Sequence, residues 1–448
     1  MRFKSVLFTI LLLPTALMAK DMAVTVYNSN LGVITETRSL EFSKGINRLD
    51  FQDVPSSIDA SSVRFEVVGG GEVTILEQNY AYDLVSPDQL YQKYIDKEIE
   101  LIDKDGRLYP GTLLAANNGA VTLREKSGHV KIIQLANITE VNFPELPEGL
   151  ITRPTLFWRY NSNINGSRDC VVSYQTAGMS WSAEYVGVLD DAEKNLALSG
   201  WASITNNSGK TYDDATLRLV AGQINRVQQP SIRGGRSDME LFAKAPSAAG
   251  FEQKAFFEYH LYTLPRKATL ANHEEKQISL FDPATTTVTK QYAYNPDRDS
   301  DRVNVKVVFT NSKAAGLGLP LPAGRVRLFK ADEDGTLILL GEDAVEHTPV
   351  DEQMKLTVGK AFDIVAEQRL MDQQRISQRV EEQAWEIELR NRKKEAVSVE
   401  VEKNLYGDWE LLKSSIAGTR KDAYTLIFDV PVAAGDTTVL SFRVRLNH

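Results

Sequence analysis

The chain has 448 residues, of which 42% are hydrophobic and 25% are charged, and its formal net charge is −9 at pH 7. This composition is typical of globular proteins, and the length predicts about two to four domains. The negative balance disfavours nucleic acids and anionic polymers as partners. The single cysteine, Cys170, excludes an internal disulfide, so core burial alone must hold the fold together.

Residues 1–19 have the pattern of a secretory signal peptide. Arg2 and Lys4 give a positive start, residues 6–13 form an apolar run, and the small residue Ala19 precedes Lys20. The apolar run is too short to span a bilayer. We therefore expect cleavage near Ala19 and a periplasmic or secreted protein. No later segment of the sequence predicts a membrane span.

Residues 20–85 predict an N-terminal β unit. Apolar and polar residues alternate in short runs near residues 23–26, 34–40, 47–51, 63–68 and 73–77. After this unit, Ser86 followed by Pro87 predicts the start of a short helix that reaches Tyr94, with the Ser86 side chain as its N-cap.

Residues 86–147 predict a small closed barrel. Five short strands are expected near residues 98–102, 108–115, 120–124, 130–135 and 138–142, and Asp-Gly, Asn-Gly and Ser-Gly pairs predict tight turns between the first four. Closure would remove the exposed sheet edges, and the spacing resembles that of SH3-like or Sm-like barrels. The near-equal numbers of acidic and basic residues give no electrostatic footprint for nucleic acid.

Residues 150–448 predict an antiparallel β-sandwich region, either one sandwich or two. Strict alternation at residues 385–390, 397–402 and 440–446 is typical of strands with one buried and one wet face. The Pro-, Gly- and Ser-rich residues 229–255 predict a mobile loop. Cys170 shares its strand face with Val172 and Tyr174, which predicts a buried, unreactive thiol.

A longer pattern in the same region resembles a known family. It comprises Trp181, Tyr185, Asn206, Gly209, the Pro- and Gly-rich residues 318–326, and Trp409. Together these residues resemble a domain-of-unknown-function family that includes proteins labelled mucoidy inhibitor A-like. The chain departs from the pattern at Tyr212, where a Trp is usual, and it lacks the long coiled-coil insertion of many members. The resemblance implies a β-sandwich and cell-envelope biology, and it supplies no catalytic residues. The matched aromatic residues also predict a strand that pairs as a hairpin with residues 170–174.

Three residues form the one candidate ligand face. Glu258, His260 and Tyr262 alternate along a predicted strand, so an acid, a base and a phenol share one side. They could bind a ligand or transfer protons, but the same pattern is common on an ordinary wet sheet face, which we favour. The histidines have no metal-binding spacing. Asp297, Asp299 and Asp301 imitate a calcium loop whose required glycine is absent, which excludes an EF-hand.

The sequence thus predicts a mainly β, exported cell-envelope or extracellular protein without catalytic activity, metal or cofactor. Its expected role is to bind a protein, peptide or glycan. The alternative is a hydrolase that acts on an envelope polysaccharide or peptide and uses scattered carboxylates as acid and base. The oligomeric state and the identity of the ligand stay open at this point.

Overall fold

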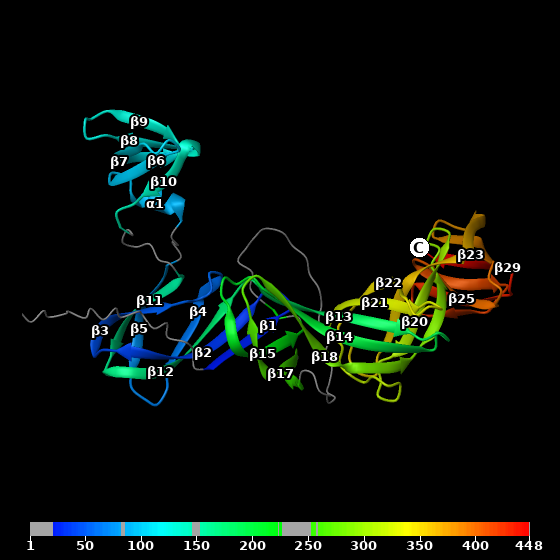
Figure 1. Cartoon of the computed structure of the whole chain (residues 1–448). Helices are drawn as coiled ribbons and strands as arrows, with labels where there is room; N and C mark the ends of the chain where they lie inside the picture. The colour runs from blue at the N-terminus through cyan, green and yellow to red at the C-terminus, as the bar shows by residue number, and fades with distance from the viewer. Residues whose placement is uncertain are drawn as a thin grey trace, which may run out of the picture.

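The computed structural model describes residues 21–81, 86–145, 153–222, 224–225, 252–256 and 259–447. Over these residues the chain is mainly β, with five sheets and two short helical segments, which confirms the predicted fold class. Figure 1 shows the larger sheets in a row from the N-terminal to the C-terminal strands, with one small sheet standing apart. The predicted signal peptide lies outside the described residues. No helix within them has the length and apolar character to cross a membrane.

A seven-stranded sheet combines the N-terminal strands with strands from the middle of the chain. Its order is β16 (Glu252–Phe256), β17 (Tyr259–Leu270), β15 (Tyr212–Ala221), β1 (Asp21–Tyr27), β2 (Gly32–Phe42), β12 (Gly166–Thr176) and β4 (Ile58–Val67). β1 is parallel to β15 and antiparallel to β2. Residues 252–255 of the predicted loop lie in β16, which pairs with β17, and residues 229–251 lie outside the described residues. Cys170 is fully buried on β12, as predicted.

A three-stranded sheet covers one half of this sheet. Its order is β3 (Gly45–Gln52), β11 (Thr155–Ser162) and β5 (Val73–Ala81). Phe51 and Trp158 stack between the two sheets with ring centroids 5.1 Å apart, and Phe65 meets Trp158 at 5.3 Å. β11 pairs with both β3 and β5, although it follows them by more than seventy residues in the sequence. Residues after 147 therefore complete the N-terminal β unit.

The small sheet contains the five strands predicted within residues 86–147. Its order is β10 (Ile138–Asn142), β6 (Glu98–Asp103), β7 (Leu108–Asn117), β8 (Ala120–Arg124) and β9 (Val130–Gln134), with a 3-10 turn η1 (Leu135–Asn137) before β10. Helix α1 (Pro87–Lys93) precedes them. The Ser86 hydroxyl accepts a hydrogen bond from the Gln89 amide at 3.2 Å, which confirms the predicted N-cap.

The predicted closure of this sheet into a barrel is wrong. β9 and β10 are its two end strands, and within the described residues they do not pair with each other. Aromatic residues from helix α1, from its C-cap and from the segment directly after β10 cover the core instead. Phe143 contacts Tyr91 and Tyr94, with ring centroids 5.6 and 4.9 Å away. Burial of the apolar face therefore does not require the end strands to meet.

A central five-stranded sheet follows. Its order is β18 (Glu274–Thr287), β14 (Asn195–Asn206), β13 (Met179–Leu189), β21 (Gly324–Ala331) and β22 (Leu337–Val345), and β13 and β21 are parallel. The expected hairpin between residues 170–174 and the strand of Trp181 and Tyr185 is wrong, because β12 and β13 lie in different sheets. The chain crosses between them at Gly178, whose φ of 80° suits glycine. An added Cβ there would lie 2.5 Å from the Asn207 carbonyl oxygen.

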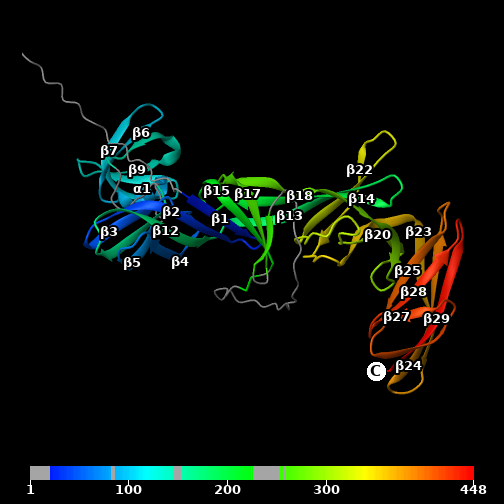
Figure 2. The same ribbon diagram turned by 90° about the horizontal axis from the view of Figure 1, so that it is seen from below.

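The C-terminal region is a nine-stranded sheet, coloured yellow to red in Figure 2. Its order is β26 (Asp408–Ser414), β29 (Thr437–Asn447), β24 (Val380–Asn391), β23 (Gln353–Arg375), β20 (Arg302–Thr310), β19 (Thr289–Tyr294), β25 (Val397–Asn404), β28 (Thr425–Val432) and β27 (Gly418–Arg420). Phe428 of β28 and Phe442 of β29 contact each other with centroids 5.1 Å apart, so the sheet folds back on its own apolar face. The predicted alternation on β24 is confirmed: Leu389 is buried, whereas Glu388 and Arg390 pair on the wet face at 2.7 Å.

Candidate functional site

The predicted face at residues 258–262 is only partly assembled. Glu258 lies outside the described residues. His260 and Tyr262 are alternate residues of β17, but Tyr262 is buried between the seven-stranded and central sheets, where its ring meets that of Trp181. The Tyr262 hydroxyl donates a hydrogen bond to the Pro320 carbonyl oxygen at 3.1 Å. Burial raises the pKa of Tyr262, so its phenol stays protonated and serves the fold.

His260 has a neighbour that sequence spacing did not indicate. Burial lowers the pKa of His260, and the charge of His347 lowers it further. Burial also lowers the pKa of His347, whose Nδ1 accepts a hydrogen bond from the Ala323 amide at 3.0 Å. An imidazole that accepts through Nδ1 carries its proton on Nε2. Both rings are therefore neutral at pH 7, and one of them positions a loop.

That loop is the proline strap, which we define as residues 318–324. Three buried side chains from different sheets donate to its carbonyl oxygens. Tyr262 binds Pro320, Tyr185 of β13 binds Pro322 at 2.7 Å, and Asn311, next to β20, binds the Leu319 carbonyl at 2.6 Å. The strap therefore ties the seven-stranded, central and nine-stranded sheets together. The sequence shows it only as a Pro- and Gly-rich segment, because the side chains that donate to it come from segments distant in sequence.

A cluster of charged side chains lies buried between β2 and the chain before β15. The Glu36 side chain has no exposed surface. It accepts hydrogen bonds from Arg38 at 2.9 and 3.0 Å and from the Tyr174 hydroxyl at 2.9 Å. The Lys210 ammonium lies 3.6 Å from the same carboxylate and donates to the Asp53 carbonyl at 2.6 Å. Burial lowers the pKa of Lys210 and raises that of Tyr174.

Perturbed groups of this kind often mark catalytic sites, but general acid–base chemistry requires contact with a substrate. The side chains of Arg38 and Lys210 are 7% and 5% exposed, and their protons are already shared with protein oxygens. We therefore assign this cluster to the fold, where it joins the N-terminal β unit to residues 206–212.

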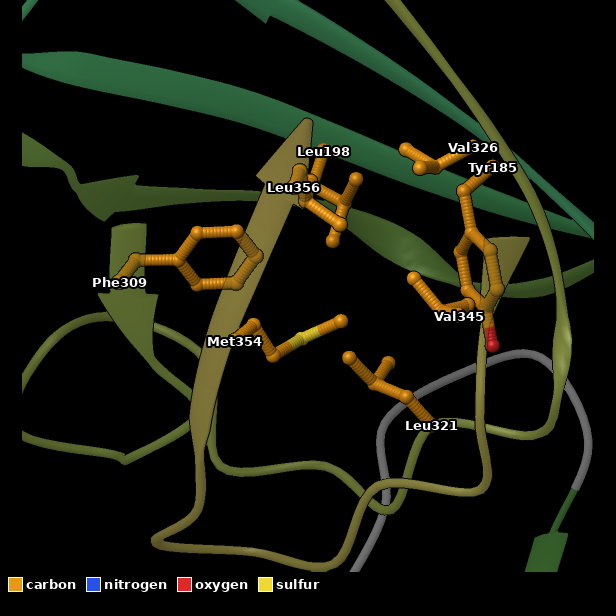
Figure 3. A pocket seen from close by; sticks show the side chains of 8 residues that line it. All are labelled: Tyr185, Leu198, Phe309, Leu321, Val326, Val345, Met354 and Leu356. Carbon is orange, nitrogen blue, oxygen red and sulfur yellow. The ribbon is translucent and has the colours of Figure 1, made fainter. Parts of the chain in front are cut away.

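A small apolar space lies between the central sheet and strands β20 and β23 (Figure 3). It is lined by Tyr185, Leu198, Phe309, Leu321, Val326, Val345, Met354 and Leu356. Its volume of about 10 Å³ is at the lower limit for one water molecule, and water would need polar partners there. The space is a gap in core packing and too small for a ligand.

The scattered carboxylates form no metal centre within the described residues, where no group of three or more potential ligands occurs. In the calcium-like segment, Asp297 accepts hydrogen bonds from the Lys403 ammonium at 2.6 Å and the Asn404 amide at 3.1 Å. Asp299 accepts from the Asn295 amide. These carboxylates thus hold a turn and an ion pair.

The most conspicuous surface feature is an apolar sheet edge. β22 is an end strand of the central sheet, and its residues 337–340, which we call the β22 edge, are all apolar. Leu337, Ile338, Leu339 and Leu340 are 53%, 49%, 50% and 36% exposed. Figure 2 shows the β21–β22 hairpin projecting from the body of the molecule. This exposure is not evident from the sequence, because four consecutive apolar residues are typical of a strand that is buried on both faces.

Comparison with known protein families places most of the chain in one of them. Residues 171–448 match the model of a family described as a domain of unknown function (DUF4139). The match begins within β12, so strands β1 to β5 and the small sheet precede it. No curated protein matches the chain.

Proposed function

The chain belongs to the DUF4139 family, whose description assigns no function, and we propose that it is an exported, non-catalytic cell-envelope protein that binds another protein. The β22 edge is the observation that carries this proposal. A strand at the end of a sheet offers unpaired backbone donors and acceptors, and natural proteins usually protect such edges with charges or proline. Here the edge presents four apolar side chains to solvent. An exposed apolar edge of this kind is a site for a partner strand.

Export is the second part of the proposal, and residues 1–19 support it. Loss of Arg2 and Lys4 with the leader would make the mature chain more acidic. N-terminal sequencing of the protein from its native host tests this part. We expect a start at or near Lys20, and an intact Met1 in a cytosolic fraction would refute export.

The relationship to mucoidy inhibitor A-like proteins is also a proposal. It rests on the residue pattern around Trp181, the proline strap and Trp409. Trp181 and the proline strap both have clear roles in the fold. Tyr185 and Tyr262 donate hydrogen bonds to carbonyl oxygens of the strap, and the Trp181 indole donates to the Val220 carbonyl oxygen at 2.9 Å.

Binding is tested on an array of overlapping peptides from envelope proteins of the same cell. The chain without residues 1–19 should bind a subset of peptides. Leu339→Asp should abolish that binding, because it places a charge in the β22 edge. The matched control is Val439→Asp, since Val439 is 47% exposed on another sheet. Equal binding by both variants would refute the β22 edge as the site.

The non-catalytic part is tested with glycan, peptide and ester substrates. We expect no turnover by the purified chain. A turnover that follows the protein through purification and is unaffected by Leu339→Asp would favour the hydrolase.

A further inference from the structure

The part of β22 that a partner can reach is short and well defined. β21 pairs with one side of the strand, as in Ile338 with Lys330. β23 packs against β22 from residue 341 onwards: an added Cβ on Gly341 would lie 1.8 Å from the Val358 carbonyl oxygen, and the Thr357 amide donates to Asp343 at 2.6 Å. Within the described residues, the part of β22 that lies clear of β23 and has no second strand beside it therefore spans residues 337–340.

Both faces of this segment are apolar. Side chains alternate along a strand, so Leu337 and Leu339 point to one face and Ile338 points to the other, while a shift in the register with β21 marks a β-bulge at Leu340. A strand added beside them would extend both faces. Its side chains must then be apolar on both sides as well, which requires consecutive rather than alternating apolar residues.

The charges around the edge are unbalanced. Asp332, Glu333 and Asp334 form the β21–β22 turn, and within the described residues they make no ion pair. The nearby basic side chains are already paired: Lys330 with Glu193 at 2.8 Å, and Arg327 with Glu342 at 2.8 Å. The turn end of the edge is therefore an acidic site next to an apolar one.

This charge pattern disfavours two other occupants. An antiparallel pair of two β22 edges brings the acidic turn of each copy towards the end of the strand that carries Asp343 in the other copy, and like charges brought close together are destabilising. An anionic membrane surface would repel the three carboxylates of the turn.

We propose that the β22 edge binds an extended segment of a partner protein in which about four consecutive apolar residues adjoin a cluster of Lys or Arg. The segment adds as a strand beside residues 337–340, and its basic residues lie against Asp332, Glu333 and Asp334. This inference rests on the proposed binding function and specifies the partner's chemistry.

The test uses the full chain without residues 1–19 and two synthetic peptides. Both carry the same run of Val and Ile, flanked on one side by Lys in the first peptide and by Glu in the second. Fluorescence anisotropy should show that the Lys peptide binds at least about tenfold more tightly in low salt, with the difference shrinking as salt screens the charges. Equal binding of the two peptides would overturn the charge assignment.

Variants separate the two parts of the site. Asp332→Asn with Glu333→Gln should weaken binding of the Lys peptide and tighten binding of the Glu peptide, so that most of the preference between them is lost. Leu339→Lys should abolish binding of both peptides, whereas Val439→Lys should preserve it. Loss of Lys-peptide binding in the Val439 variant, or its persistence in the Leu339 variant, would overturn the location.

Two further measurements test the other occupants, and the array result separates the two proposals. A dimer in sedimentation equilibrium that Leu339→Lys dissociates, or Leu339-dependent binding to phosphatidylglycerol vesicles, would overturn the proposal. If neither synthetic peptide binds, but array peptides bind and Leu339→Asp abolishes that binding, then the proposed apolar and basic segment is wrong and the proposed binding function stands. If the array also fails, both are wrong.

Discussion

Replacement of Glu36 by glutamine should destabilise the N-terminal half of the molecule more than almost any other isosteric change. The Glu36 carboxylate is fully buried and is the acceptor for Arg38, Tyr174 and Lys210. Both of its oxygens accept from Arg38. A glutamine therefore turns its NH₂ group toward a guanidinium donor in either orientation. It leaves the buried Arg38 guanidinium without the carboxylate that pairs with it, and it leaves Lys210 with only its ion pair to Asp53 at 3.5 Å.

The expected loss follows from these contacts. Removal of one partner of a buried ion pair costs about 3–5 kcal/mol, because the remaining charge stays desolvated. At about 1.4 kcal/mol for each factor of ten, this loss corresponds to a rise of about 140- to 3,700-fold in the equilibrium constant for local unfolding. Lys210→Met should cost less, since it removes a cation whose pKa burial already lowers and leaves the pair of Glu36 and Arg38 intact. The surface control is Glu367→Gln, whose pair with Arg369 is exposed to solvent, so its loss should change stability little.

Hydrogen exchange is the suitable assay, because a chain with several sheets need not unfold in one step. Peptides from β2 and β12 should lose protection in Glu36→Gln, whereas peptides from β24 and β29 should not. A change of less than about tenfold in the exchange protection of β2 would contradict this prediction. A larger loss of stability in Lys210→Met than in Glu36→Gln would also contradict it.

Three other predictions follow from the same structure. His260 and His347 have lowered pKa values in the folded protein, so the unfolded chain binds more protons below about pH 6.5 and the stability of the fold should decrease there. The melting temperature, measured between pH 8 and 5.5, should depend less on pH in His347→Asn than in the unmodified chain. An identical pH profile for the two proteins would contradict this prediction. Burial raises the pKa of Cys170 to about 12, so the thiol should react with maleimide only after denaturation, and rapid native labelling would show that it is accessible. Met354→Ala should enlarge the apolar gap and cost about 2–5 kcal/mol in urea unfolding, whereas a loss below about 1 kcal/mol would show that the core relaxes around it.

The local features of the fold were predictable from the sequence. The strands of the small sheet and the N-cap at Ser86 depend on alternation, turn residues and side chains a few positions apart, all of which a sequence displays. The barrel closure was wrong because closure depends on where the end strands β9 and β10 lie in space. The hairpin after Cys170 was wrong because two adjacent strands with similar patterns can join different sheets across one glycine.

The candidate site was less predictable, for two reasons. His347 is 87 positions beyond His260, and only the fold brings their charges into range. The β22 edge has the apolar run of an internal strand, and its exposure depends on the absence of a neighbouring strand in the sheet. Neither fact is encoded in local periodicity.

The interior position of β1 in the seven-stranded sheet has a consequence for the order of folding. One neighbour, β2, follows at once, but the other, β15, begins at Tyr212. A parallel pairing over so long a stretch of chain forms late, because the loop between the strands must first close. Residues 21–27 therefore lack half of their hydrogen-bond partners until the middle of the chain is in place. Strand β1 in this topology therefore reaches its full set of hydrogen bonds later than a strand that pairs only within a local hairpin at a sheet edge.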